Sequence, residues 1–329
     1  MSDPPVRLLV ALPPESETRA RIEARLPGVP YVFLEESDAT KWVTVEALLA
    51  GSVARVAARF DAEAMPKLRF VQVVYTGLDR FPFERFPPAA AIAGNVGGYA
   101  PFVAEHAVAL ALASARQLPS AMALAREGRL RPAPENRSLR GLTATILGFG
   151  EIGHEVSKRL KSFGMKIVAV GRVGRPDPLA DESMAATELA KALARADLVI
   201  DARPLTDLTR QSIGTRELQA MKSAAIYVNV GRAATIDEAA LFEHLKSHPE
   251  FRAATDPWWD EDFVAGTIGH RTAIAQLPNF LGTPHNSANG PGAREYALGR
   301  ALENLSRFFQ GETPLYLADR HEYGARSTP

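Results

Sequence analysis

Six residues in the middle of the chain have a spacing that could bind a dinucleotide. The run is Gly148-Phe149-Gly150-Glu151-Ile152-Gly153, after the apolar stretch 143–147 and before a plausible helix that stops near Gly164. In such a strand, turn and helix, the first glycine makes the turn, the second lets the backbone approach a pyrophosphate, and the third lets the helix pack on the strand. The helix N-terminus then faces the anion. Alone, the pattern also fits a plain strand–turn–helix junction, so the prediction depends on its surroundings.

The strand after this helix bears on which dinucleotide would bind. NAD-binding versions of the unit carry an Asp or Glu about 20 residues after the glycines, where it bonds the ribose hydroxyls. No acid occurs between Val156 and Pro176, and the strand 166–170 is followed by Arg172 and Arg175. Two guanidinium groups suit a 2′-phosphate, which a carboxylate would repel, although both could be solvated loop residues. We therefore predict NADP(H) as the cofactor in preference to NAD(H).

The elements that would position these residues alternate between strand and helix. Strands are predicted at 6–12, 31–34, 68–75, 91–93, 143–147, 166–170, 197–201 and 225–230, and helices at 15–26, 103–116, 187–195, 215–221, 238–246 and 293–310. Residues 43–49 fit either element, and 126–140 are predicted to be a surface loop. The alternation predicts an α/β fold with a doubly wound parallel sheet.

Length and composition exclude several classes of protein. A chain of 329 residues suits two domains, and 38 basic against 38 acidic residues give no general attraction to nucleic acid or an anionic membrane. Without cysteine the chain has no disulfide, thiolate nucleophile or cysteine-ligated metal, and we predict no metal site. No apolar run approaches the roughly 18 residues of a membrane helix, and the first residues, 1–5, carry no basic segment with an apolar core, so we expect no leader peptide. These features predict a cytoplasmic protein that acts on a small molecule.

The position of the glycine motif limits which domain arrangements are possible. Because the glycines lie near residue 150, a dinucleotide domain here must be inserted into another domain. With the stretch 103–110 (VAEHAVAL) ahead of them, the sequence resembles the D-isomer-specific 2-hydroxyacid dehydrogenases. The resemblance covers nearly the whole chain, and its further motifs are Pro204-Leu205-Thr206 with Thr209, Asn229-Val230-Gly231-Arg232, the segment 256–262 in place of D-V-F-x-x-E-P, and Thr283-Pro284-His285.

This resemblance implies a fold and a set of binding residues. It implies a Rossmann-type domain, 101–286, inserted into a smaller flavodoxin-like substrate domain, 1–100 plus 287–329, and a homodimer formed through 103–116. Further cofactor contacts are implied for Pro204, Thr209, Val230 and Asp256. The substrate would meet Arg232 and, from the loop after the strand 91–93 and the end of the strand 68–75, the residues Gly98, Tyr99 and Tyr75.

Carried over residue by residue, the resemblance assigns Arg232, Glu261 and His285 as the catalytic set. Hydride transfer to a 2-oxo acid builds negative charge on the carbonyl oxygen, and His285 can supply the proton near neutral pH. A carboxylate on the other imidazole nitrogen fixes the ring, which is the role implied for Glu261, although Asp260 and Asp262 flank it. Arg232 would hold the substrate carboxylate and polarise its carbonyl.

The chain also departs from the family pattern. Pro257 and the pair Trp258-Trp259 replace the usual residues before Glu261, and Asp262 replaces a proline. The two tryptophans could shape a pocket for an apolar or aromatic substrate or could pack in the interior, and His106 is predicted to be a packing residue.

These features predict NADPH-dependent reduction of glyoxylate, hydroxypyruvate or a similar 2-oxo acid to a D-2-hydroxy acid. The alternatives are a cofactor-sensing regulatory protein and a formate or phosphite dehydrogenase. Because the formate branch of the family pairs its histidine with Gln, Glu261 argues against formate.

Overall fold

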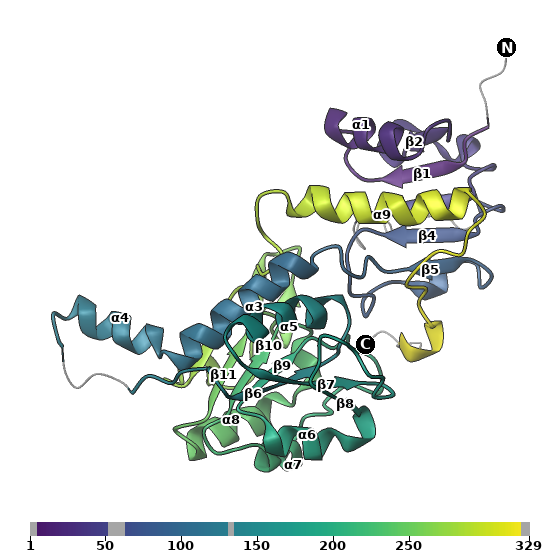
Figure 1. Ribbon diagram of the computed structural model, residues 1–329. Coiled ribbons are helices and arrows are strands. Elements are labelled where there is room, and N and C mark those ends of the chain that lie inside the picture. Colours follow the sequence, from purple (N-terminus) through teal and green to yellow (C-terminus); the bar gives the residue numbers. More distant parts are fainter. Residues whose placement is uncertain (1–4, 52–62, 131–134, 324–329) are drawn as a thin grey trace. The chain divides into compact units, whose positions relative to one another are not determined.

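The structure, a computed structural model, describes residues 5–51, 63–130 and 135–323. The chain divides into two compact units, the first formed by 1–99 with 291–329 and the second by 100–290 (Figure 1). The second unit is therefore an insertion within the sequence of the first. The sequence had predicted the two borders at 100/101 and 286/287.

Unit 1 is built on a five-stranded parallel sheet. Its strands are β1 (Leu8–Ala11), β2 (Tyr31–Phe33), β3 (Ala47–Ala50), β4 (Phe70–Val73) and β5 (Ala91–Ala93), in the order β2-β1-β3-β4-β5. This is the flavodoxin-like order, as predicted. The helices α1 (Ser16–Arg25) and α9 (Ala293–Phe309) pack on the face that carries Leu8 and Val10, while Leu9 faces a second apolar cluster on the other side. Because both faces are covered, β1 is apolar throughout.

Unit 2 contains a seven-stranded sheet in which all pairings are parallel. Its strands are β6 (Thr143–Leu147), β7 (Lys166–Gly171), β8 (Glu182–Ala185), β9 (Leu198–Asp201), β10 (Ile226–Asn229), β11 (Arg252–Thr255) and β14 (Phe280–Gly282). The order β14-β11-β10-β9-β6-β7-β8 reverses direction at β6, which is the doubly wound Rossmann pattern with one added edge strand. The predicted fold class is confirmed.

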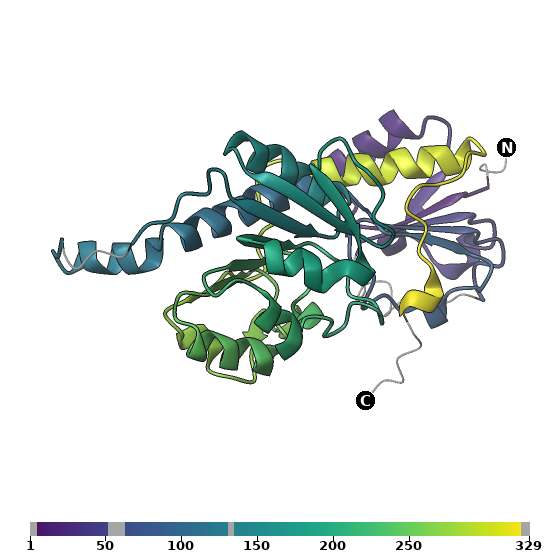
Figure 2. The same cartoon turned by 60° about the horizontal axis from the view of Figure 1, so that its bottom comes forward.

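Helices cover both faces of this sheet. They are α3 (Ala100–Ala115), α5 (Glu151–Ser162), α6 (Leu189–Arg195), α7 (Thr215–Ala220) and α8 (Glu238–Ser247). The helix α4 (Leu118–Arg126) follows α3, buries none of its residues and extends away from the sheet (Figure 1). The views show α3 and α5 on one face and α6, α7 and α8 on the other (Figures 1 and 2). The second face is sealed by apolar side chains of β7, β9 and β10, including Val168, Val199 and Tyr227.

Several elements differ from the sequence prediction. The helix α4 was not predicted; Pro119, which follows the end of α3, stands in the first turn of α4, where proline loses no helical hydrogen bond. The strands β8, β11 and β14 were not predicted, nor was the antiparallel hairpin of β12 (Asp260–Asp262) and β13 (Thr267–Gly269). Among the described residues no single helix is long and apolar enough to cross a membrane; α3 and α4 reach that length and apolarity only together, with a bend of 61° between them.

Candidate active site

The glycine motif forms a tight turn between β6 and α5. Gly148 has φ +86°, and a Cβ on Gly153 would lie 2.6 Å from the Gly148 carbonyl oxygen, so both positions require glycine. A Cβ on Gly150 would meet no described atom within 4 Å, so the space beside this residue is open. Gly150 is also the N-cap of α5, and no side chain caps the first turn of that helix in the described structure. The turn therefore fits a pyrophosphate, because backbone donors remain for an anion that can approach closely.

The other residues of the motif shape this turn. The Phe149 ring lies edge-on to the His154 ring, with 5.0 Å between the ring centroids. Glu151 and Ile152 open α5, and both are partly exposed.

The segment after β7 carries the two predicted arginines. Arg172 and Arg175 are both exposed, and the backbone between them turns back at Gly174, where φ is +59° and a Cβ would lie 2.6 Å from the Ala185 nitrogen. The first carboxylate after β7 belongs to Asp177. Its Oδ2 lies 3.0 Å from His154 Nε2, and its Oδ1 accepts from the Leu179 N–H at 2.9 Å. This carboxylate is therefore engaged within the unit.

The predicted proline turn follows β9. Thr209 Oγ1 accepts from the Thr206 N–H at 2.9 Å and donates to the Pro204 carbonyl at 2.7 Å, so one hydroxyl closes the turn at both ends. This explains why a threonine follows Pro204 at this spacing. Pro204 itself is exposed.

Arg232 is carried by a loop directly after β10. The side chain of Asn229 ties this loop together, because its Oδ1 accepts from the Gly231 N–H at 3.0 Å and its Nδ2 donates to the Arg232 carbonyl at 3.0 Å. Arg232 also donates from its guanidinium to the Gly231 carbonyl at 2.9 Å. Val230, between them, is buried and donates its N–H to the Asp201 carbonyl at 2.9 Å. The predicted N-x-x-R pattern is thus a structural unit in which Asn229 shapes the backbone at Arg232.

Glu261 and His285 form a close pair. Glu261 Oε1 lies 2.6 Å from His285 Nδ1 and also accepts from the Trp258 N–H at 2.8 Å. The Glu261 side chain is 6 % exposed and that of His285 is 24 % exposed. Because a carboxylate can only accept, Nδ1 carries a proton and Nε2 is the nitrogen left to exchange one with a ligand. Of three adjacent carboxylates, Glu261 makes this contact, while Asp260 and Asp262 are exposed.

Comparison with known proteins identifies the family of this chain. Residues 108–287 match the model of the NAD-binding domain of the D-isomer-specific 2-hydroxyacid dehydrogenases. The chain belongs to the D-isomer-specific 2-hydroxyacid dehydrogenase family.

Its relatives include a hydroxypyruvate reductase from Thermotoga maritima, 32 % identical over 78 % of this chain and 82 % of the relative. A glyoxylate reductase from Thermococcus gammatolerans is 30 % identical over 88 % of this chain and 89 % of the relative. Among solved structures, one from Pyrobaculum aerophilum, provisionally named a formate dehydrogenase, is 28 % identical with a TM-score of 0.81 and covers 97 % of this chain and 100 % of its own.

In this dehydrogenase, Asp256 lies beneath the His285 turn. His285 has φ +50°, an uncommon backbone conformation for a residue other than glycine. The buried Asp256 carboxylate accepts from the N–H groups of Asn286 and Ser287, both at 3.0 Å, and from Thr283 Oγ1 at 2.7 Å. Asp256 was predicted to contact the cofactor; in the described structure its oxygens hold the turn that presents His285.

His106 joins the same cluster, contrary to its prediction as a packing residue. Its Nε2 lies 2.9 Å from Thr283 Oγ1 and 3.6 Å from Asp256 Oδ1. The apolar sequence around His106 in α3 concealed this contact, since its partners follow about 150 residues or more later in the chain. His106 is thus a polar residue of the site that sequence reasoning missed.

The two tryptophans pack inside unit 2. Trp258 is 7 % exposed and donates from Nε1 to the Thr283 carbonyl at 2.7 Å, and its ring leaves no room for a Cβ on Gly282. Trp259 donates from Nε1 to the Ile236 carbonyl at 3.0 Å. The ring that lies beside His285 is instead that of Phe263, with 5.4 Å between the centroids and an angle of 61° between the planes. Of the two interpretations, interior packing describes the tryptophans.

Two of the predicted substrate residues of unit 1, Gly98 and Tyr99, lie in the glycine-rich loop after β5, and the third, Tyr75, follows β4. Gly98 has no room for a side chain, because a Cβ would lie 2.4 Å from Asn95 Nδ2, and that amide donates to the carbonyls of Val74 and Ala297 at 3.0 and 2.8 Å. Burial raises the pKa of Tyr75 and of Tyr99. Within the described part of the chain the buried Tyr75 hydroxyl has no hydrogen-bond partner.

Proposed function

We propose that this dehydrogenase reduces small 2-oxo acids, such as glyoxylate and hydroxypyruvate, to 2-hydroxy acids of the D configuration where the product is chiral, with NADPH as the hydride donor. The 2.6 Å pair of Glu261 and His285 carries the proposal, because it leaves Nε2 as a proton donor on an oriented imidazole. Arg232, at the C-terminal end of a neighbouring parallel strand, supplies the group that would bind a carboxylate. The substrates named for the relatives belong to this class.

In the proposed reaction, each side chain has one task. NADPH, which the turn Gly148–Gly153 would hold, would supply the hydride for the carbonyl carbon of the 2-oxo acid. His285 donates a proton from Nε2 to the carbonyl oxygen as negative charge builds there, and Glu261 holds the ring and favours its protonated form. Arg232 binds the substrate carboxylate and polarises the neighbouring carbonyl. In the oxidation direction, neutral His285 takes the proton from the hydroxyl group.

The preference for NADPH rests on the segment after β7. Arg172 and Arg175 are exposed cations beside the sheet edge where a ribose would lie, and the Asp177 carboxylate is bonded to His154. Cations there favour a 2′-phosphate. We assign Gly148–Gly153 to the pyrophosphate and the turn Pro204–Thr209 with Val230 to the nicotinamide ribose. Asp256, beside the His285 turn, is assigned a contact with the cofactor.

We assign unit 2 as the dinucleotide domain and unit 1 as the substrate domain, where the backbone around Gly98 and Tyr99 with the side chain of Tyr75 would meet the substrate. We further infer a cytoplasmic homodimer, with α3 in the contact between subunits.

The test follows the absorbance of NADPH and NADH with glyoxylate, hydroxypyruvate and pyruvate, and of NADP⁺ with formate. We expect oxidation of NADPH by at least one 2-oxo acid, with a higher kcat/KM than for NADH. Absence of oxidation with every acid would support a regulatory binding protein, and reduction of NADP⁺ by formate would support a formate dehydrogenase instead. A clear preference for NADH would refute the role given to Arg172 and Arg175.

A further inference from the structure

A buried ion pair joins the C-terminal end of β9 to the segment that follows it. Arg203 meets Asp201 with both ends of its guanidinium, Nε to Oδ1 at 2.9 Å and Nη2 to Oδ2 at 2.6 Å. The Asp201 side chain is fully buried and that of Arg203 is 13 % exposed. Burying two charges costs desolvation free energy, and removing one partner leaves the other as an unpaired buried charge.

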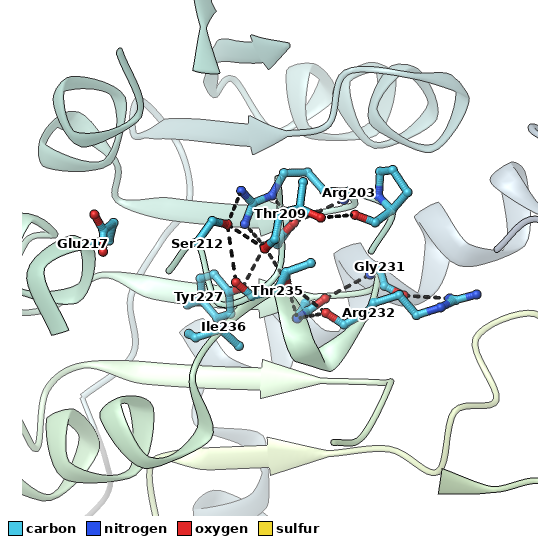
Figure 3. A network of polar contacts seen from close by, with 12 residues as sticks. Arg203, Thr209, Ser212, Glu217, Tyr227, Gly231, Arg232, Thr235 and Ile236 are labelled. Atoms are coloured by element: carbon cyan, nitrogen blue, oxygen red, sulfur yellow. Dashed lines mark hydrogen bonds and ion pairs between the residues drawn. The ribbon is translucent and has the colours of Figure 1, made fainter. Parts of the chain in front are cut away.

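The Asp201 carboxylate accepts further hydrogen bonds. Its Oδ2 accepts from the Tyr227 hydroxyl at 2.9 Å and from Thr235 Oγ1 at 3.0 Å, and its Oδ1 accepts from the Arg203 N–H at 3.2 Å. The ion pair is therefore fixed in position from β9 and β10 and from the loop that follows β10 (Figure 3).

Thr235 connects the ion pair to the backbone at Arg232. Its Oγ1 lies 3.0 Å from Asp201 Oδ2 and 2.9 Å from the Arg232 carbonyl oxygen, so its single hydroxyl proton is directed between these two acceptors. The same hydroxyl accepts from Asn229 Nδ2 at 3.4 Å. Figure 3 shows Thr235 between the Arg203 guanidinium and Gly231, with the Arg232 side chain extending away from the cluster.

The backbone of Gly231 also contacts the backbone of the two residues of the ion pair. Its N–H donates to the Asp201 carbonyl at 3.0 Å, and a Cβ on Gly231 would lie 2.4 Å from the Arg203 carbonyl oxygen. The residue before Arg232 thus has no freedom to shift toward β9.

A second branch of the cluster leads to the proline turn. Arg203 donates from Nη1 to Ser212 Oγ at 2.9 Å, and Ser212 Oγ donates to the Thr209 carbonyl at 2.8 Å. Thr209 closes the turn that starts at Pro204. One ion pair therefore reaches both the loop of Arg232 and the turn Pro204–Thr209.

We propose that Asp201 and Arg203 form a positioning pair that sets the substrate-binding arginine through Thr235 and the cofactor-binding turn through Ser212. This inference rests on the proposed function, because that function gives Arg232 and the turn their ligands. The pair would act through its neighbours, because the Nε, Nη1 and Nη2 atoms of Arg203 are each hydrogen-bonded within the cluster.

The two branches can be tested with variants that remove one hydroxyl each. Thr235→Val keeps the shape of the side chain and removes the link to Arg232, so we expect the KM for glyoxylate and the inhibition constant of oxamate, a 2-oxo acid analogue, to rise about tenfold. The dissociation constant of NADPH, measured by its fluorescence, should stay within about twofold. Thr235→Ser keeps the hydroxyl and should restore wild-type values.

Tyr227→Phe is the matched control, because it removes the other hydroxyl on Asp201 Oδ2 without touching the Arg232 loop. It should change both constants much less than Thr235→Val changes oxamate inhibition, because Arg203 and Thr235 still hold the Asp201 carboxylate. Ser212→Ala should show the reverse of Thr235→Val, with NADPH binding weakened about tenfold and oxamate inhibition nearly unchanged.

Melting temperatures of all four variants separate positioning from loss of fold. Unchanged oxamate inhibition in Thr235→Val, or equal losses in Thr235→Val and Tyr227→Phe, would overturn the positioning role while leaving the proposed function intact. If Ser212→Ala and Thr235→Val weakened both ligands equally, the separate branches would be refuted. If the wild-type protein reduced no 2-oxo acid, the proposed function would fail first, and this inference with it.

Discussion

Replacement of Glu261 by Gln isolates the charge that Glu261 places on His285. Gln keeps an oxygen that can accept from both His285 Nδ1 and the Trp258 N–H, so the local structure should persist. Two unit charges about 4 Å apart interact by about 4 kcal/mol at an effective dielectric constant of 20. Since a quarter of the His285 side chain is exposed and the hydrogen bond remains, about half of this value is expected to be lost. A loss of about 2 kcal/mol lowers kcat/KM roughly 30-fold at neutral pH.

The assay is steady-state reduction of glyoxylate at neutral pH, with kcat/KM compared between Glu261→Gln and the wild-type protein. Asp260→Asn is the control, because it removes the same charge one residue away at an exposed position. An unchanged kcat/KM in Glu261→Gln, or an equal loss in Asp260→Asn, would refute the reasoning.

Three further predictions concern the cofactor, the glycine of the arginine loop and a buried histidine. Replacing Arg172 and Arg175 together by Ala should lower kcat/KM for NADPH about tenfold or more and leave that for NADH nearly unchanged, measured with both cofactors; an equal loss with NADH would count against the 2′-phosphate. Gly231→Ala should lower the melting temperature and weaken oxamate inhibition, since its Cβ would lie 2.4 Å from the Arg203 carbonyl oxygen. A melting temperature and an oxamate inhibition constant equal to those of the wild-type protein would contradict this. Burial lowers the pKa of His244 to about 4, with help from His248 nearby. In the unfolded chain the same histidine takes up a proton as the pH falls through about 6.5, whereas in the folded protein it stays neutral until about pH 4. The free energy of unfolding should therefore fall by about 1–2 kcal/mol as the pH drops from 7 to 5. Denaturant titrations should show a smaller fall for His244→Leu.

Much of the fold follows from local sequence. Strands such as β6 and β9 have the nearly continuous apolar sequence of buried parallel strands. The glycines at 148 and 153 are required by a backbone geometry that their spacing indicates. The strands β11 and β12 were missed because their residues carry little strand propensity: β11 reads Arg-Ala-Ala-Thr and β12 reads Asp-Glu-Asp. Tertiary pairing, which a local pattern does not contain, makes them strands.

The site shows the same division. The motifs predicted which backbone segments carry Arg232, Glu261 and His285, because each motif is a local unit of a few residues. The ion pair of Asp201 with Arg203 and the contact of His106 with Thr283 could not be predicted in the same way. The first places charges at the end of a strand where an apolar residue would be expected, and the second joins residues 177 positions apart.

The account depends most directly on His285 as the proton donor. The decisive measurement compares His285→Ala with the wild-type protein in steady-state reduction of glyoxylate and in NADPH binding followed by fluorescence. Loss of a positioned general acid should reduce kcat at least about 100-fold. The dissociation constant of NADPH should change by less than about twofold, because the glycine turn Gly148–Gly153 and the arginines after β7 are unaltered. Turnover retained within a few fold of wild type would contradict the central claim and remove His285 from the mechanism.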